Sequence, residues 1–318
     1  LAVEIYVHKR SPTPTTPQPM NQAHQPQNLS NRTVLHSIVL VLLSLALLFL
    51  TSASQQAQAQ SMEFEIKKVE YQNLIAKLYL PKTNKKVPVV IAFGGSDPSW
   101  AHADANGEMM AKNGIAVVGV VYFKMDPSLP ASLDQIPMEY FIKAIDYAQS
   151  VPQIDASRIG VVTGSRGSEA GFLLAILDQR IKSVVITTPS KVAWGGMTSA
   201  RSAWTYQGKD IPSLSLPELP NATQIERFNH ALANQERVKQ AMFAFEKING
   251  PILLISAEND QIWPCTSMSN DIVDYLKQKE FRFPVVHKSY PTGHGFSRET
   301  APEIKQMIID HFMMTLKN

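Results

Sequence analysis

A serine in a glycine-containing turn is the first position in the chain that could carry chemistry. Residues 161–170 read VVTGSRGSEA, and Ser165 directly follows an apolar run. A nucleophile elbow has the pattern Gly-x-Ser-x-Gly, because the sharp strand-to-helix turn needs small neighbours two residues to either side. Gly167 fits, whereas Thr163 stands where the first glycine is expected. Ser165 is therefore either a catalytic nucleophile or an ordinary serine that caps a helix. We expect Thr163→Gly to be tolerated, because it would only relieve crowding behind the serine.

A carboxylate that could orient a catalytic histidine follows a later apolar run. Asp260 lies in the segment PILLISAENDQIWP, in the loop after a predicted strand. Asn259 cannot ionise and Glu258 lies closer to the strand, so Asp260 is the preferred acid. The alternative is that Asp260 is a solvated loop residue or a cap for the helix after Pro264.

A histidine that could act as the base lies in the segment SYPTGHGF. His294 is flanked by glycines there, on a loop after the last predicted strand. A general base of this kind must reach the proton of the nucleophile, and a strand-end loop permits that. The other histidines beyond residue 60 lie inside a strand, on helical segments or near a helix start, and we expect them to be structural: His287, His230, His311 and His102.

The elements that must position these residues alternate strand and helix signals. Residues 62–71 and 74–80 alternate apolar and polar side chains and predict an opening antiparallel pair. Short Val- and Ile-rich runs then predict buried strands at 87–93, 115–123, 158–164, 181–187, 251–256 and 283–290. Between them lie amphipathic helices, one of which begins near Met138. The pattern predicts an α/β fold with a mostly parallel central sheet and helices on both faces.

One segment interrupts this alternation. Residues 190–248 contain several prolines and two tryptophans and end in a helical pattern. Their position between the strands at 181–187 and 251–256 predicts a cap-like insertion over a pocket. Trp194 and Trp263 either flank the mouth of that pocket or belong to the core.

The order Ser165, Asp260, His294, each after a separate strand, is the order found in the α/β-hydrolase fold. In such a site His294 takes the proton of the serine hydroxyl, and Asp260 holds the imidazole in the required tautomer. This chemistry needs no cofactor and no metal, and we predict neither.

The oxyanion hole of this site is predicted from two backbone segments. One donor is the N–H of Arg166, and the other comes from the loop after the strand at 87–93, at Gly95 and Ser96. The Arg166 side chain either faces the pocket, where it could meet an anionic substrate, or reaches solvent. Glu169 lies on the first turn of the following helix, where its charge suits the helix dipole, and we interpret it as structural.

Residues 1–59 are predicted to lie outside the folded domain, which is expected to comprise residues 60–318. Residues 11–31 are rich in Pro, Gln, Asn, Ser and Thr, a composition that buries too little apolar surface to fold. The chain carries a formal charge of +3, of which residues 1–59 contribute +2. No basic block lies in the predicted domain, so nucleic acid is not expected as a partner. The single cysteine, Cys265, excludes an intrachain disulfide and a cysteine-rich metal site.

An apolar run near the N-terminus predicts export. Ile38–Leu50 reads IVLVLLSLALLFL, with Arg32 before it and Ala57-Gln58-Ala59 after it. A basic flank, an apolar run and an Ala-x-Ala site form the pattern of a secretory signal peptide. The alternative is a membrane anchor at residues 34–50, but a spanning helix needs roughly 20 apolar residues. We therefore expect a periplasmic or secreted protein with no stable membrane span after cleavage.

Five longer segments carry a family signature. They read YFKMDPSLPASLDQIPMEYFIKAIDYAQ, IGVVTGSRGSEAGFLLAI, ITTPSKVAWGG, FEKINGPILLISAENDQIWP and YPTGH. Over residues 87–316 the chain resembles the C-terminal catalytic domain of acyl-CoA thioester hydrolases and bile acid-CoA:amino acid N-acyltransferases. The resemblance implies an α/β-hydrolase that cleaves a small-molecule ester or thioester, with Ser165 as nucleophile, Asp260 as acid and His294 as base. The amino-acid-conjugating branch typically has a cysteine nucleophile, and this chain has Ser165 instead.

Two other functions fit the same residues. One is a carboxylesterase or dienelactone-hydrolase-like enzyme acting on small soluble esters. The other is a catalytically silent hydrolase-fold binding protein, which the missing first elbow glycine at Thr163 would favour. Export would also separate the protein from the cytoplasmic acyl-CoA pool, so we expect an ester or thioester substrate rather than acyl-CoA specifically.

Overall fold

A computed structural model describes residues 61–316. The predicted leader at 1–59 lies outside the described residues, so the boundary at residue 60 and the signal peptide stay predictions. Within 61–316, no helix is both long enough and apolar enough to cross a membrane.

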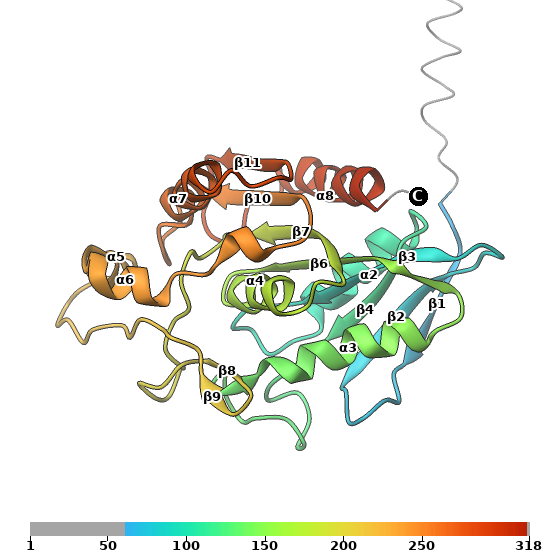
Figure 1. The fold of residues 1–318 in the computed structure, drawn as a ribbon, viewed down its shortest axis with the longest axis horizontal. Helices are drawn as coiled ribbons and strands as arrows, with labels where there is room; N and C mark the ends of the chain where they lie inside the picture. Colours follow the sequence, from blue (N-terminus) through green and yellow to red (C-terminus); the bar gives the residue numbers. More distant parts are fainter. Residues whose placement is uncertain (1–60, 317–318) are drawn as a thin grey trace, which may run out of the picture. The chain divides into compact units, whose positions relative to one another are not determined.

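An eight-stranded sheet forms the centre of the described chain, with the strands in the order β1-β2-β4-β3-β6-β7-β10-β11 (Figure 1). The pairs β1–β2 and β2–β4 are antiparallel, and all other neighbours are parallel. The predicted opening hairpin and mostly parallel sheet are therefore confirmed. The strands are β1 (Phe64–Lys68), β2 (Ala76–Pro81), β3 (Val87–Phe93), β4 (Ala116–Val120), β6 (Ile154–Gly164), β7 (Ile181–Thr187), β10 (Ile252–Ala257) and β11 (Val285–Tyr290).

Helices cover both faces of this sheet, which explains why its central strands are almost continuously apolar. Alternate residues of a strand point to opposite faces. In β3, Val89, Ile91 and Phe93 pack on the side of α3, α4 and α7, whereas Val90 and Ala92 pack on the side of α2 and α8. The helices are α2 (Ala101–Ala111), α3 (Met138–Ser150), α4 (Gly167–Leu177), α7 (Cys265–Gln278) and α8 (Ala301–Thr315).

The predicted strand at 115–123 is too long at its carboxyl end. β4 ends at Val120, although Val121, Tyr122 and Phe123 remain buried. An apolar run indicates that residues are buried but does not indicate whether their backbones pair with a neighbouring strand. The strand predicted from the sequence therefore continues past the point where pairing ends. The buried residues beyond β4 pass beneath the loop that follows β3, where the Tyr122 hydroxyl meets that loop's carbonyls.

The predicted insertion at 190–248 lies between β7 and β10 and has its own secondary structure. It contains β8 (Trp204–Tyr206), β9 (Lys209–Asp210), α5 (Gln224–Ala233), α6 (Gln235–Ala241) and the 3-10 helix η1 (Phe245–Lys247). β8 pairs with β9 and with β5 (Ile136–Pro137), which precedes α3, so the insertion is tied to the main body by a small second sheet. Figure 1 shows α5 and α6 beyond the carboxyl ends of the parallel strands, where ligands bind in open α/β sheets.

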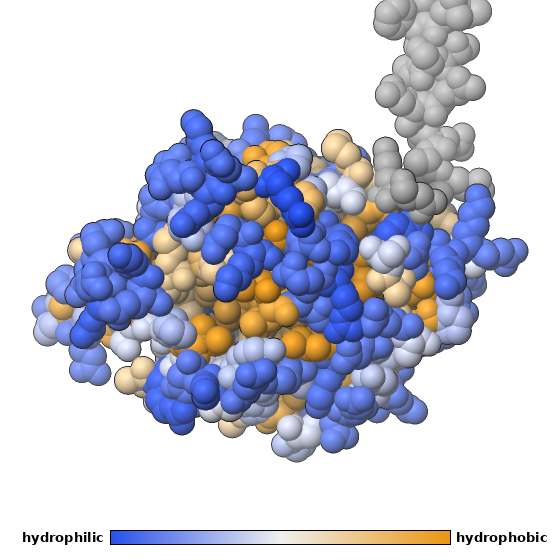
Figure 2. All heavy atoms as spheres, viewed as in Figure 1, coloured by the Kyte–Doolittle hydropathy of each residue, from blue (hydrophilic) through white to orange (hydrophobic). Residues whose placement is uncertain are grey.

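The face of the molecule over α4 is its most apolar part in this view. Figure 2 shows hydrophobic side chains gathered in the middle of that face, with hydrophilic ones around them. Residues 167–175 of α4 are buried, and its sequence, GSEAGFLLAIL, is mostly small or aliphatic. The helix that begins at the candidate nucleophile is therefore held in the core rather than on the surface.

Candidate active site

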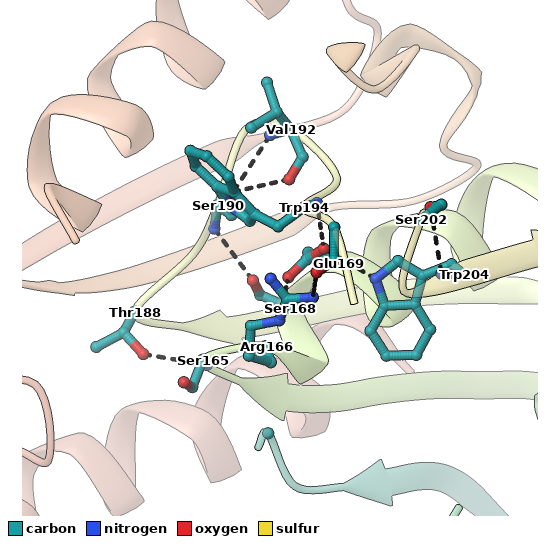
Figure 3. Close-up of polar contacts among 12 residues, drawn as sticks. Ser165, Arg166, Ser168, Glu169, Thr188, Ser190, Val192, Trp194, Ser202 and Trp204 are labelled. Atoms are coloured by element: carbon teal, nitrogen blue, oxygen red, sulfur yellow. Dashed lines mark hydrogen bonds and ion pairs between the residues drawn. The ribbon is translucent and has the colours of Figure 1, made fainter. Parts of the chain in front are cut away.

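Ser165 occupies a strained turn between β6 and α4. Its φ angle is +54°, a left-handed conformation that a residue other than glycine adopts at an energetic cost. The backbone N–H of Ser165 donates to the Thr187 carbonyl and to Thr188 Oγ1, both at 3.1 Å (Figure 3). β6 ends at Gly164 and α4 begins at Gly167, so the turn has the strand-to-helix geometry of a nucleophile elbow.

Thr163 is accommodated by two glycines of α4. An added Cβ on Gly167 would lie 2.2 Å from Thr163 Oγ1 and from the Gly94 carbonyl oxygen, and one on Gly171 would lie 2.4 Å from Thr163 Cγ2. The threonine side chain therefore fills the space that these glycines leave, and it is completely buried. The expectation that Thr163→Gly only relieves crowding is thus wrong on packing grounds, because that change would open a void behind the serine.

The three predicted triad residues meet in one hydrogen-bonded chain. His294 Nε2 lies 2.8 Å from Ser165 Oγ, and His294 Nδ1 lies 2.7 Å from Asp260 Oδ2. When Nδ1 carries the hydrogen and donates a hydrogen bond to the Asp260 carboxylate, the lone pair of Nε2 can accept the proton of the serine hydroxyl. The side chain of Asp260 is 2% exposed and that of His294 is 21% exposed, so the acid is shielded while the imidazole is partly accessible.

Asp260 is held by the loop between β10 and α7. Its Oδ1 accepts from the backbone N–H groups of Ile262 at 2.8 Å and Trp263 at 3.3 Å. Burial alone would raise the pKa of Asp260, but the hydrogen bond and charge of His294 and the loop amides outweigh it, and the pKa lies below its usual range. Glu258, the acid rejected from the sequence, is exposed and accepts from Ser289 Oγ at 2.6 Å.

The loops after β10 and β11 are joined, and this positions His294. The Asn259 N–H donates to the Thr292 carbonyl at 3.0 Å, and the indole ring of Trp263 meets the imidazole edge-on with centroids 5.9 Å apart. The other four histidines lie elsewhere, as predicted. Burial lowers the pKa of both His102 and His311 to about 4, His287 Nε2 bonds Ser256 Oγ at 2.7 Å, and His230 lies exposed on α5.

The backbone segments predicted to form the oxyanion hole lie beside the serine. An added Cβ on Gly95 would lie 2.8 Å from Ser165 Cβ and 3.2 Å from the Arg166 nitrogen, so only glycine allows this approach. Ser96 lines the same cavity as Ser165. The sequence did not point to Tyr122, whose hydroxyl reaches the Gly95 carbonyl at 2.6 Å and the Gly94 carbonyl at 3.0 Å. The only sequence signal for it is a tyrosine at the end of an apolar run.

Ser165 lines a cavity of about 690 Å³. Most of the cavity lining comes from the insertion between β7 and β10, including Gly195, Gly196, Leu216, Arg227 and Phe228. Trp263, from the loop between β10 and α7 that carries Asp260, also lines the cavity. Trp194 is not at the mouth of this cavity but in the core, where it meets Phe228 edge-on with centroids 4.5 Å apart. Polar and apolar groups share the lining, so the cavity suits a ligand with both kinds of surface.

Arg227 is a cation on that wall. Its Nε donates to the Pro217 carbonyl at 2.9 Å, and within residues 61–316 no carboxylate forms an ion pair with it. The same part of the chain contains no cluster of three His, Cys, Asp or Glu residues that could hold a metal ion.

Glu169 has a different environment from the one expected for a charge near a helix end. Its side chain is completely buried, and Oε2 accepts from the Trp194 backbone N–H and from Trp204 Nε1, both at 2.8 Å (Figure 3). Oε1 forms an ion pair with Arg166 Nε at 3.1 Å, and Arg166 Nη2 donates to the Gly195 carbonyl at 2.8 Å. The Arg166 side chain, 11% exposed, therefore packs along the cavity wall and does not reach out into solvent.

The sheet order, the helices on both faces and the strand-end site define an α/β-hydrolase fold. Solved structures with this arrangement include a putative dienelactone hydrolase from Klebsiella pneumoniae (TM-score 0.53, 14% identity, covering 80% of this chain and 99% of that one). The esterase Est22 is similar at a TM-score of 0.54 and 16% identity, covering 80% of this chain and 81% of that one. At these identities the likeness concerns the fold alone.

The sequence places the chain in a family within that fold. Residues 136–311, more than half of the chain, match the family described as BAAT / Acyl-CoA thioester hydrolase C terminal, and the chain belongs to it. Mouse mitochondrial acyl-coenzyme A thioesterase 2 is 26% identical over 69% of this chain and 47% of that protein. Mouse acyl-coenzyme A amino acid N-acyltransferase 1 is 27% identical over 63% of this chain and 46% of that protein. The chain thus spans about half the length of these curated relatives.

Proposed function

We propose that the protein is a serine hydrolase that cleaves an ester or thioester through an acyl-enzyme on Ser165. The observation that carries the proposal is the hydrogen-bonded chain Asp260–His294–Ser165 at the head of a helix. Membership of a family whose relatives are named acyl-CoA thioesterases and N-acyltransferases supports the same class of reaction.

The chemistry follows from this geometry. Ser165 Oγ attacks the acyl carbonyl carbon while His294 Nε2 takes the hydroxyl proton, and Asp260 stabilises the imidazolium that forms. The N–H groups of Arg166 and of the loop at Gly95 and Ser96 stabilise the oxyanion. His294 then gives its proton to the departing alcohol or thiol, which leaves the acyl group on Ser165. A water molecule, deprotonated by His294, attacks the acyl-enzyme, releases the carboxylic acid and restores the serine.

We further propose a thioester with an anionic leaving group as the preferred substrate, a chemistry that acyl-CoA represents and that does not require the cytoplasmic acyl-CoA pool as its source. The names of the relatives favour it, and Arg227 supplies a cation on the cavity wall without an acidic partner among the described residues. A guanidinium in that position can bind a phosphate or carboxylate through its free N–H groups.

A hydrolysis panel tests the reaction and the substrate class together. It compares acyl-CoAs, the same acyl groups on N-acetylcysteamine, and p-nitrophenyl esters of matched chain length, each with wild type and with Ser165→Ala. Faster turnover of the CoA thioesters supports the proposal, whereas faster turnover of small uncharged esters favours a carboxylesterase or dienelactone-hydrolase-like enzyme. A folded protein that hydrolyses none of them and ignores a fluorophosphonate probe would be a hydrolase-fold binding protein.

We also propose export, on the sequence of residues 32–59 alone. Expression in a bacterial host followed by fractionation and N-terminal sequencing tests this directly. A periplasmic protein that begins near Gln60 supports the proposal. An intact N-terminus on membrane-bound protein supports the anchor instead.

A further inference from the structure

Glu169 is the most deeply buried charged side chain near the candidate nucleophile. It lies four residues after Ser165 on α4, with no exposed surface, and the proposed reaction assigns it no role. Its two oxygens contact three groups: the Arg166 guanidinium, the Trp194 backbone N–H and the Trp204 indole N–H (Figure 3). Burying a carboxylate is costly unless it is paired and hydrogen-bonded. Oε2 accepts two hydrogen bonds, whereas Oε1 accepts none among the described residues and is held by the charge of Arg166 alone.

Of these partners Arg166 lines the cavity, whereas Trp194 and Trp204 lie in the core directly behind the lining residue Gly195. The Ala203 N–H donates to the Trp194 carbonyl at 3.1 Å, and Gly195 forms a β-bridge with Ser202, so residues 194–196 and 202–204 run side by side. Glu169 Oε2 binds one residue from each run, Trp194 and Trp204. Gly195 is held again by Arg166 Nη2, and Gly195 itself lines the cavity with Ser165.

We propose that Glu169 is a positioning residue for the proposed hydrolase: its carboxylate holds the paired segments 194–196 and 202–204, together with the Arg166 side chain, in the arrangement that shapes the cavity wall lined by Arg166, Gly195 and Gly196. The inference rests on the proposed function for its kinetic consequence. The contacts themselves do not depend on which bond the enzyme cleaves.

The ionised form is the one that can make all three contacts. The carboxylate attracts the Arg166 guanidinium through its charge while Oε2 accepts from both tryptophans, whereas a protonated carboxyl loses its attraction for Arg166. The charged or titratable groups facing Glu169 are Arg166 from the elbow and Tyr122 from the segment after β4. Burial raises the pKa of Glu169 to about 7 against the opposing effect of Arg166, so the hold weakens as the pH falls below neutrality.

Steady-state kinetics of Glu169→Gln test the proposal. The glutamine keeps the shape but turns an amide toward Arg166 or toward the tryptophans. We expect KM for an acyl substrate that fills the cavity to rise about tenfold, while labelling of Ser165 by a small fluorophosphonate changes less than about threefold. The matched control is Asp178→Asn, at the other end of α4, where a carboxylate of 8% exposure pairs with Arg180 at 2.5 Å away from the cavity. It should leave KM and labelling unchanged.

A readout independent of turnover comes from the indole N–H signals of ¹⁵N-labelled protein. The Trp204 indole donates to Glu169, whereas the Trp194 indole donates to Ser190 Oγ at 2.8 Å and serves as an internal reference. We expect the Trp204 signal, assigned with Trp204→Phe, to titrate with a midpoint of about 7 in wild type. In Glu169→Gln it should not titrate, and the Trp194 indole signal should titrate in neither protein.

The outcomes separate the two hypotheses. A Glu169→Gln enzyme with wild-type KM overturns the positioning role even if hydrolysis is confirmed. A protein without hydrolase activity but with a titrating Trp204 signal overturns the proposed function and leaves Glu169 as the residue that holds this wall. If Glu169→Gln does not fold, the double variant Arg166→Gln/Glu169→Gln replaces it, because removing both charges leaves no unpaired charge buried. An unchanged KM in the double variant equally overturns the proposal.

Discussion

His294 Nε2 lies 2.8 Å from Ser165 Oγ, although 129 positions separate the two residues in the chain. The contact exists because β6 and β11 lie in one parallel sheet, with β7 and β10 between them, so that their carboxyl ends share one edge. A loop at the end of each strand then brings a hydroxyl and an imidazole together in the geometry that proton transfer requires.

Substitution of the triad residues should abolish the reaction. Ser165→Ala and His294→Ala should each lower kcat by roughly 10⁴-fold or more, because the triad acts as a unit. Asp260→Asn should have a smaller effect, because the imidazole remains but loses its orienting acceptor. Fluorophosphonate labelling followed by mass spectrometry checks this, with circular dichroism as the folding control. Rapid labelling of the His294→Ala protein would show that another base activates the serine.

Tyr122→Phe should lower kcat while KM stays close to wild type. The hydroxyl holds the Gly94 and Gly95 carbonyls, and because a trans peptide unit is planar, it thereby orients the N–H groups of Gly95 and Ser96. A loosened oxyanion donor should reduce kcat on the order of tenfold to a hundredfold. The matched control is Tyr140→Phe, which removes a part-buried hydroxyl that donates to the Val121 carbonyl at 2.9 Å. Equal losses of kcat in both variants would contradict a specific role for Tyr122.

Thr163 and Gly171 should be energetically coupled. Gly171→Ala should lower the free energy of unfolding by about 1–3 kcal/mol, because its methyl group would lie 2.4 Å from Thr163 Cγ2. Thr163→Ala removes that atom, so the double variant should be more stable than the sum of the single effects by about 1 kcal/mol. Urea unfolding of the four proteins measures the coupling. Strict additivity would mean that the threonine does not fill the space left by the glycine.

Arg227→Gln should act on anionic substrates selectively. We expect KM for an acyl-CoA to rise about fivefold to tenfold, with little change for the same acyl group on N-acetylcysteamine. Arg237→Gln, which removes the same charge from an exposed position on α6, is the control. An equal rise of KM for both thioesters would mean that Arg227 shapes the cavity and does not bind charge. If KM rises only for a substrate whose acyl chain carries a carboxylate, Arg227 binds an anion on the acyl part of the substrate and not on the leaving group.

Ionisation of Glu169 should lower stability as the pH rises. Its pKa is raised from an ordinary value of 4.5 to about 7 in the folded protein, chiefly by burial. The folded protein holds this proton more tightly than the unfolded chain does, so the protonated carboxyl contributes to the free energy of unfolding. That contribution is fully present below pH 4.5 and is lost as the pH rises to about 7. The difference in unfolding free energy between wild type and Glu169→Gln should therefore shrink by about 3 kcal/mol between pH 4.5 and 7. Denaturant unfolding at several pH values measures it, and a pH-independent difference would contradict a perturbed carboxyl.

Much of the fold can be read from the sequence because its signals are local. Val- and Ile-rich runs between amphipathic segments predict a parallel sheet with covered faces, and the runs at 87–93 and 181–187 match β3 and β7 residue for residue. Ser165, Asp260 and His294 can be chosen in the same way, because each follows a strand, and strand ends in such a sheet meet at one edge.

The surroundings of the triad depended on contacts between residues distant in the sequence. Glu169 has the local pattern of an ordinary charge near a helix start, and it becomes a buried anchor only because Trp194 and Trp204, 25 and 35 positions later, donate to it. Tyr122 reads as one more apolar residue after a strand, yet its hydroxyl holds a loop 27 residues earlier. Periodicity and residue type indicate which positions are buried, since burial patterns follow from neighbours along the chain. The partner of a buried polar group is set by which segments pack together, and only the tertiary structure decides that.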